Sequence, residues 1–99
     1  VYQRALVVEL CERGLSAQME VPLTVSYRGN VVGSFVADII VEGKVIVEVK
    51  AVSALVPEHF AQLINYLNAK AIDVGLLVNF GTPRAECHRC HSRRVHTPR

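Results

Sequence analysis

The apolar residues near the N-terminus recur at the spacing of a helix. Between residues 2 and 13 they are separated by glutamine, arginine and glutamate, which is the pattern of an amphipathic helix, and Gly14 is well placed to end it. The pattern then changes to an alternation of apolar and mostly polar positions, which predicts a strand at residues 17–27. Pro22 within this run indicates that the strand lies at an edge or contains a bulge.

Two more strands are predicted to follow as a hairpin. A turn at residues 28–30 leads into a strand at residues 31–41, and Glu42 and Gly43 form a tight connection into a third strand at residues 44–49. Because this connection is short, the second and third strands are expected to be antiparallel neighbours.

A second helix and a buried strand complete the apolar pattern. Pro57 suits the first turn of a helix that extends to about residue 70, and its apolar stripe consists of Phe60, Leu63, Ile64 and Leu67. Residues 73–80 form a short run rich in valine and leucine, as expected of a buried strand. From Gly81 onward the apolar pattern stops. The predicted order is helix, three strands, helix, strand, which indicates an α/β fold.

Length and charge divide the chain into two parts. With 99 residues, of which 51% are hydrophobic, the chain suits one compact domain, which we expect at residues 1–83. Residues 84–99 hold five arginines and one glutamate, a charge of +4, and are expected to form a basic, poorly ordered tail. The first 83 residues hold six basic and eight acidic residues, a charge of −2. The overall charge of +2 is therefore poor evidence that the domain itself binds nucleic acid.

The sequence favours a protein of the reducing cytoplasm. No apolar stretch approaches the roughly 18–20 residues of a membrane-spanning helix, so no membrane association is expected. No secretory leader is visible, although the chain starts at Val1 and its N-terminus is expected to be incomplete. The three cysteines are an odd number and suggest no disulfide framework.

The tail contains a CxxCH motif, formed by Cys87, Cys90 and His91. This spacing occurs in c-type haem attachment and in half of a zinc site, which His96 could complete. Haem attachment requires an exported protein, and the segment has almost no apolar residues to anchor a metal site. Adventitious metal affinity or disorder is therefore favoured over zinc, and zinc over haem.

The third strand carries the most informative charged residues. One of its faces consists of valines, whereas the other presents Ile46, Glu48 and Lys50. Ile46 indicates that this second face is covered too, as in a central strand. A carboxylate at the border of a covered region needs a partner, which a metal ion or the ammonium of Lys50 would supply. A simple ion pair at the end of the strand is the plainer alternative.

Asp38, in the neighbouring strand, reaches Glu48 in only one of two registers. A two-residue loop would pair Asp38 with Val47 and place the two carboxylates on opposite faces. A three-residue loop that includes Lys44, or a bulge, would pair Asp38 with Glu48 directly. Two carboxylates that close together repel unless a cation lies between them, and such oxygen ligands suit Mg²⁺ or Mn²⁺. The sequence alone leaves the register open.

At this point the chain resembles a known family. Asp38 followed after nine residues by Glu48-Val49-Lys50 is similar to the D…(D/E)xK signature of the PD-(D/E)XK nuclease superfamily, and the predicted order of elements is similar to its core. More closely, several segments over residues 2–80 resemble the bacterial GxxExxY family, namely Tyr2 and residues 37–41, 45–51 and 61–67. Of the Gly-x-x-Glu-x-x-Tyr segment only Tyr2 is present, since its glutamate would precede Val1.

The resemblance implies a restriction-endonuclease-like core with a mixed central sheet, and metal-dependent hydrolysis of phosphodiester bonds in nucleic acid. Asp38 and Glu48 would hold Mg²⁺ or Mn²⁺, helped by the carbonyl of Val49. Lys50 would orient or help deprotonate the attacking water and offset the charge that develops on the phosphate.

The second helix adds Gln62 and Tyr66 to this expectation. They are four residues apart and share a helix face. The resemblance implies that this face borders the active site, so both are candidate catalytic residues. The plainer alternative is a solvated helix face with Tyr66 half-buried. His59, one turn earlier, is expected to be an ordinary surface histidine.

The expected partner is nucleic acid, with DNA favoured over RNA. Because the domain carries a charge of −2, a homodimer or another partner could complete the substrate surface. The alternative function is a non-catalytic module on the same fold that binds nucleic acid or protein.

Overall fold

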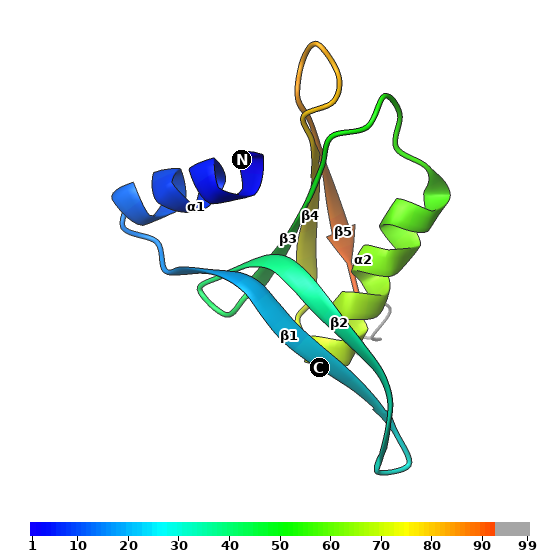
Figure 1. Ribbon diagram of the computed structural model, residues 1–99. Coiled ribbons are helices and arrows are strands. Elements are labelled where there is room, and N and C mark those ends of the chain that lie inside the picture. The colour runs from blue at the N-terminus through cyan, green and yellow to red at the C-terminus, as the bar shows by residue number, and fades with distance from the viewer. Residues whose placement is uncertain (93–99) are drawn as a thin grey trace, which may run out of the picture.

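The computed structural model describes residues 1–92, which form two helices and one five-stranded sheet (Figure 1). The elements are, in chain order, α1 (Tyr2–Glu12), β1 (Ala17–Tyr27), β2 (Asn30–Val41), β3 (Val45–Lys50), α2 (Pro57–Lys70), β4 (Val74–Asn79) and β5 (Glu86–His91). The sheet has the spatial order β1-β2-β3-β4-β5, in which β3 and β4 are parallel and all other neighbours are antiparallel. The predicted α/β fold with a mixed sheet is confirmed. Neither helix is long and apolar enough to cross a membrane.

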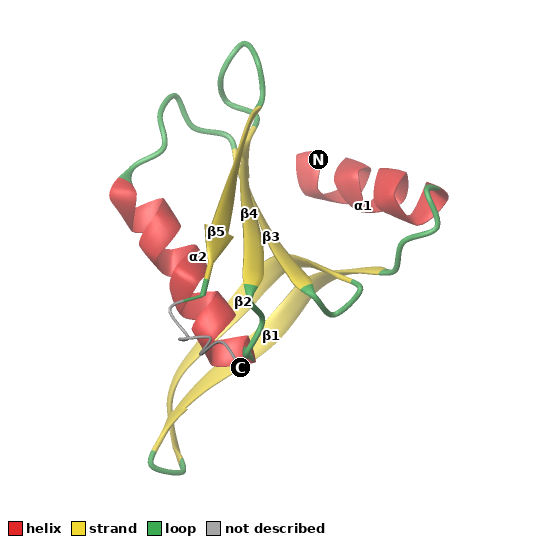
Figure 2. Cartoon of the chain, turned by 180° about the vertical axis from the view of Figure 1, so that it is seen from behind, coloured by secondary structure: helices red, strands yellow, loops and turns green. Residues whose placement is uncertain are grey.

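The two helices cover opposite faces of the sheet (Figures 1 and 2). Leu63 and Leu67 of α2 are fully buried in one core with Ile46 of β3 and Leu77 of β4. Helix α1 packs less closely on the other face, because none of its residues is buried and an apolar cavity of about 340 Å³ lies between it and the sheet. The α2 side therefore holds the larger core, and burial of its side chains supplies most of the hydrophobic stabilisation.

Helix α2 is fixed at its start and along its length. The ring Nδ1 of His59 accepts a hydrogen bond from the backbone N–H of Val56 (3.1 Å), which satisfies a donor that the helix start would otherwise leave open. His59 is thus a structural residue of the helix start. Further along, β4 carries Gly75, where an added Cβ would lie 2.9 Å from Leu63 Cδ1. The absence of a side chain at Gly75 allows α2 to lie close to the sheet.

The last strand corrects a prediction. Residues 84–99 were expected to form a poorly ordered tail, but Glu86–His91 forms β5, which pairs antiparallel with β4 in the register Gly75↔Cys90. Only Cys90 of this strand is buried, so the strand lacks the alternation of apolar residues by which a strand is usually found in a sequence. Its hydrogen bonds to β4 hold it as the outer strand of the sheet.

The strand conformation also removes the zinc and haem interpretations of the CxxCH motif. Cys90 lies in the core below α2, whereas Cys87 lines the cavity below α1. Residues three apart on a strand point to opposite faces, so the two thiols diverge. His96, the fourth ligand of the expected zinc set, lies outside the described residues, as do three of the five arginines of the basic segment, Arg93, Arg94 and Arg99.

The hairpin of β1 and β2 is twisted part-way along its length, so that one set of its side chains faces α1 near residue 17 and α2 from residue 21 onward. Ala17 packs with the core below α1, whereas Val21 and Leu23 of the same strand pack with the core below α2. Regular alternation would keep all three on one face. Between them, Glu20 has a left-handed backbone conformation (φ 55°) and lies opposite Asp38. As a result the outer half of the hairpin extends along α2 (Figure 2). The edge position predicted from Pro22 is confirmed, since β1 is an outer strand.

Candidate functional site

The register between β2 and β3 is the one that brings Asp38 to Glu48. The observed pairs are Ile39↔Val47, Ile40↔Ile46 and Val41↔Val45. The connection therefore comprises residues 42–44, and the same register continued by one residue sets Asp38 opposite Glu48. Glu42 and Gly43 both have positive φ angles (55° and 64°), and Lys44 N–H donates to the Val41 carbonyl (2.9 Å), which closes the three-residue turn.

Asp38 and Glu48 are joined by a reciprocal pair of hydrogen bonds. The backbone N–H of Asp38 donates to Oε2 of Glu48 (2.8 Å), and the backbone N–H of Val49 donates to Oδ2 of Asp38 (2.8 Å). Each carboxylate thus uses one oxygen to hold the other strand. The second oxygens, Oδ1 and Oε1, accept no hydrogen bond from the described residues. We call this arrangement of Asp38, Glu48 and Val49 the carboxylate clamp.

Glu48 is poised between its protonated and ionised forms. Its side chain is only 4% exposed. Burial raises the pKa of Glu48 from 4.5 to about 7, and the nearby charge of Asp38 also raises it. The hydrogen bond from the Asp38 N–H and the charge of Lys50 act in the opposite direction and lower the pKa. Burial raises the pKa by more than the hydrogen bond and Lys50 lower it. The ionised carboxylate of Glu48 is therefore incompletely stabilised, and a nearby cation would stabilise it.

Lys50 lies at the end of β3, half-buried, on the same strand face as Glu48. Its charge acts on Glu48, but it makes no ion pair within 4.0 Å in the part of the chain that the structure describes. The plain ion pair considered from the sequence is therefore absent from residues 1–92. The Lys50 ammonium therefore lies near the clamp but forms no ion pair with either of its carboxylates.

Tyr66 lies near the clamp. Gln62 belongs to the same helix but is exposed to solvent. Tyr66 is 5% exposed and packs with Ala37 and Ile40 in the core below α2. Burial raises the pKa of the Tyr66 phenol, and the charges of Glu48 and Asp38 raise it further. Gln62 is exposed and makes no hydrogen bond with the residues that the structure describes. The structure thus brings together Asp38, Glu48, Lys50 and Tyr66, and leaves Gln62 at the solvent-facing side of α2.

The clamp offers two carboxylates whose hard oxygen atoms would suit a metal ion. Within residues 1–92, no group of three or more His, Cys, Asp or Glu side chains lies close enough to hold a metal. A divalent ion would therefore need a backbone carbonyl, water or a substrate oxygen in addition to Asp38 and Glu48. Mg²⁺ is commonly bound in this way, through one or two carboxylates with water and phosphate oxygens. The donor set and the raised pKa of Glu48 both fit such an ion.

Comparison with known protein families identifies the family to which the chain belongs. The sequence profile of the PD-(D/E)XK nuclease superfamily matches residues 1–90. The chain belongs to this superfamily. The match includes Asp38, Glu48 and Lys50, and it extends through most of β5, in agreement with the place of that strand in the sheet. Nucleases of the superfamily generally depend on a divalent metal ion.

A solved structure has the same fold as this PD-(D/E)XK chain. The crystal structure of the protein called SSO0001 is similar with a TM-score of 0.73 and 23% sequence identity, over 92% of this chain and 48% of that one. At this identity the similarity supports the restriction-endonuclease-like fold and nothing more. This chain spans about half the length of that protein. No curated protein sequence matches the chain.

One residue that holds the carboxylate clamp was missed in the sequence analysis. The side-chain amide of Gln3, on α1, donates to the backbone carbonyl of Asp38 (2.7 Å). Since the Asp38 N–H is bound by Glu48, both backbone polar groups of Asp38 are held by side chains. Gln3 lies 35 residues away in sequence, among the polar positions of α1, where no pattern distinguishes it from a solvated glutamine.

The ends of β3 and β4 are held by a second set of contacts. Asn79 is fully buried, accepts hydrogen bonds from the N–H groups of Val52 and Gly81 (3.0 Å each) and donates to the Val52 carbonyl (2.9 Å). The N–H of Phe80 donates to the Lys50 carbonyl (2.8 Å), and the Phe80 ring stacks on Tyr2 of α1 (4.7 Å between centroids). These contacts fix the backbone from which Lys50 projects.

Replacing Gln3 with alanine is expected to loosen α1 from the site. The free energy of unfolding should fall by about 1 kcal/mol, the usual net contribution of one hydrogen bond. Hydrogen exchange of the α1 amides should also become faster. Arg4→Ala, at the exposed neighbouring position, is the matched control. Equal stability and equal exchange in the two variants would contradict a role for Gln3 in holding α1 to Asp38.

Proposed function

We propose that the chain is a metal-dependent nuclease domain that hydrolyses phosphodiester bonds in nucleic acid. The observation that carries the proposal is the carboxylate clamp, which holds Asp38 and Glu48 side by side with one oxygen of each unbonded to the described residues. Superfamily membership supports the same chemistry.

In this proposal Asp38, Glu48 and the carbonyl of Val49 hold Mg²⁺ or Mn²⁺. The bound ion supplies an activated water and neutralises charge on the phosphate. Lys50 orients the attacking water, and its charge offsets the negative charge that develops on the phosphate oxygens. The absence of an ion pair to Lys50 within the described residues leaves its ammonium available for this role.

The helix residues are proposed to act around this centre. Tyr66, buried beside both carboxylates, positions the phosphate by its hydroxyl. Gln62, one turn nearer the start of α2, lies where it can contact substrate that approaches from solvent. Both are weaker candidates for direct participation than Lys50, since neither is bonded to the clamp.

Several finer assignments belong to the same proposal. The segments similar to the GxxExxY family support a bacterial, cytoplasmic protein, and DNA is the favoured substrate over RNA. A homodimer would widen the substrate surface beyond this small acidic domain. The second candidate function is a non-catalytic module that binds nucleic acid or protein. It is favoured by one observation, namely that only two carboxylates meet at the site within residues 1–92.

Cleavage assays separate these two functions. Labelled DNA and RNA are incubated with the protein and Mg²⁺ or Mn²⁺, and with the variants Glu48→Ala and Lys50→Ala. The proposal expects metal-dependent cleavage by the native chain, and a loss of roughly 100-fold or more in each variant. If the native chain cleaves neither substrate and both variants bind nucleic acid unchanged, the non-catalytic module is the correct function.

A further inference from the structure

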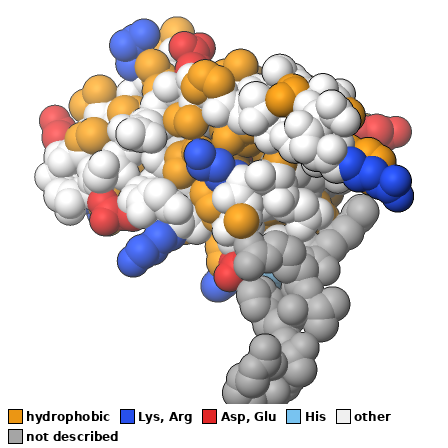
Figure 3. All heavy atoms as spheres, turned by 90° about the horizontal axis from the view of Figure 1, so that it is seen from below, with side chains coloured by type: hydrophobic (Ala, Val, Ile, Leu, Met, Phe, Trp, Pro, Cys, Tyr) orange, Lys and Arg blue, Asp and Glu red, His pale blue; other side chains and the backbone are white. Residues whose placement is uncertain are grey.

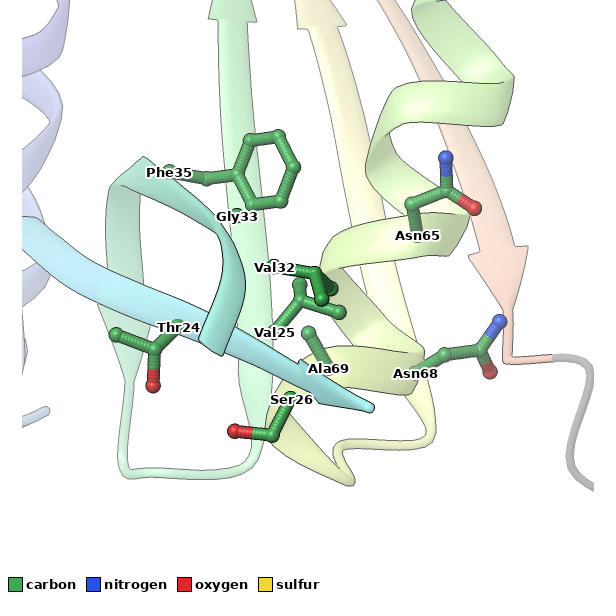
Figure 4. Close-up of a pocket in the computed structure, with 9 residues that line it drawn as sticks. All are labelled: Thr24, Val25, Ser26, Val32, Gly33, Phe35, Asn65, Asn68 and Ala69. Atoms are coloured by element: carbon green, nitrogen blue, oxygen red, sulfur yellow. The ribbon is translucent and has the colours of Figure 1, made fainter. Parts of the chain in front are cut away.

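A groove of about 570 Å³ lies between the outer half of the β1–β2 hairpin and α2 (Figure 4). It exists because the hairpin rotates at Glu20 and then extends along the helix. Val25 and Val32 of the hairpin and Ala69 of α2 form its apolar centre. These three side chains are small, so the hairpin and the helix leave a space between them that their own side chains do not fill.

The two sides of the groove are polar but uncharged. Asn65 and Asn68 line it from α2, and Thr24 and Ser26 line it from β1. In Figure 4 Asn65 and Asn68 lie on the helix side of the apolar centre and Thr24 and Ser26 on the strand side, with the two hydroxyls directed away from the centre. Asn65 is exposed and makes no hydrogen bond with any other described residue. Its donor and acceptor are therefore open to a ligand.

The groove is continuous with the carboxylate clamp through two aromatic rings. Phe35 lines the groove, and its ring lies 5.2 Å from that of Tyr66, with a tilt of 50°. Tyr66 in turn is close enough to Glu48 and Asp38 for their charges to raise its pKa. Tyr66 and Ala69 are three residues apart on α2, a rise of about 4.5 Å, so the groove begins next to the site.

We propose that this groove binds the base of an unpaired nucleotide next to the scissile phosphate, which makes single-stranded nucleic acid the substrate class. This inference rests on the proposed nuclease function. An apolar centre bordered by asparagine amides on the helix side matches a nucleobase, whose faces are apolar and whose edge carries donors and acceptors. Phe35 offers a ring for stacking, and the Asn65 amide can pair with the edge of the base.

The charge distribution favours a base over a phosphate as the occupant. None of the groove residues is charged, whereas phosphate-binding grooves contain lysine or arginine. Figure 3, which views the molecule from below, shows the basic side chains scattered over the described residues on that side, without a continuous stripe. A base in a duplex has its edge paired and its faces stacked, so only an unpaired or flipped-out nucleotide can enter such a groove.

Binding of oligonucleotides without metal tests the inference separately from catalysis. Fluorescence anisotropy is measured in EDTA with a labelled eight-nucleotide single strand, with the same strand made abasic, and with the matching duplex. The native chain should bind the intact strand about tenfold more tightly than the abasic strand, as expected from one stacked and hydrogen-bonded base. Asn65→Ala should lose part of that factor for the intact strand, since stacking on Phe35 remains, and should bind the abasic strand as the native chain does. Gln18→Ala, exposed on β1 outside the groove, is the control.

The outcomes distinguish the groove from the nuclease. The inference is overturned if Asn65→Ala and Gln18→Ala bind equally, if the abasic strand binds as well as the intact one, or if the duplex binds as tightly as the single strand. Any of these results together with metal-dependent cleavage would support the nuclease function and reject the base-binding groove. Base-dependent binding that Asn65→Ala weakens and Gln18→Ala leaves unchanged, in a chain that cleaves nothing, would support the groove and overturn the nuclease function.

Discussion

Replacing Glu48 with glutamine is expected to abolish detectable Mn²⁺ binding, and strand cleavage with it, while the fold is kept. The amide oxygen of glutamine can still accept the hydrogen bond from the Asp38 N–H, so the link between β2 and β3 need not break. What is lost is a negative charge beside a second carboxylate. Neutral amides are much weaker ligands for a divalent ion than carboxylates when most other positions are filled by water.

Calorimetric titration with Mn²⁺ measures this effect directly. The native chain should show a saturable heat of binding for one ion, and Glu48→Gln should show only the heat of dilution. Glu58→Gln, at an exposed position in the first turn of α2, removes the same charge away from the clamp and should bind as the native chain does. If Glu48→Gln retained the Mn²⁺ affinity of the native chain, Glu48 could not be a metal ligand and the proposed centre would be wrong.

The pairing of Asp38 with Glu48 shows how far local pattern determines the site. The sequence identified both residues and the two registers open to them, but could not choose between them. The choice depends on the turn at residues 42–44, where Glu42 takes a left-handed conformation in addition to Gly43. A glutamate with positive φ is uncommon, and the residues beside Glu42 in the sequence do not predict this conformation.

Strand β5 and Gln3 were missed for a related reason. Strand β5 is held by backbone hydrogen bonds to β4 and buries only Cys90, so its side chains carry no periodic signal. Gln3 acts through a contact with a residue 35 positions away. Burial patterns are readable along one segment, whereas contacts between distant segments appear only once the fold is known. The helices and the four apolar strands were predicted because apolar residues recur along each of them at the period of a helix or of a strand.

The metal-free protein is expected to lose stability as the pH rises from about 4.5 to about 8, because of Glu48. Its pKa is near 4.5 in the unfolded chain and about 7 in the folded one, so between these values the folded state binds more protons. The neutral carboxyl is tolerated in its buried position, and its stabilising effect is complete below pH 4.5. Ionisation of Glu48 beside Asp38 removes that effect as the pH passes through 7, at a cost of up to about 3 kcal/mol.

Denaturant unfolding in EDTA at a series of pH values isolates this contribution when the native chain is compared with Glu48→Gln. Groups away from the clamp are the same in both proteins, so the difference in unfolding free energy should shift against the native chain by up to about 3 kcal/mol between pH 4.5 and 8. Mn²⁺ should restore the native chain at high pH and leave the variant unchanged, because the ion binds the ionised clamp in the folded state only. A difference that does not vary with pH would mean that Glu48 ionises as freely in the folded protein as in water, and the clamp would then lack the unmet charge that a metal ion is proposed to satisfy.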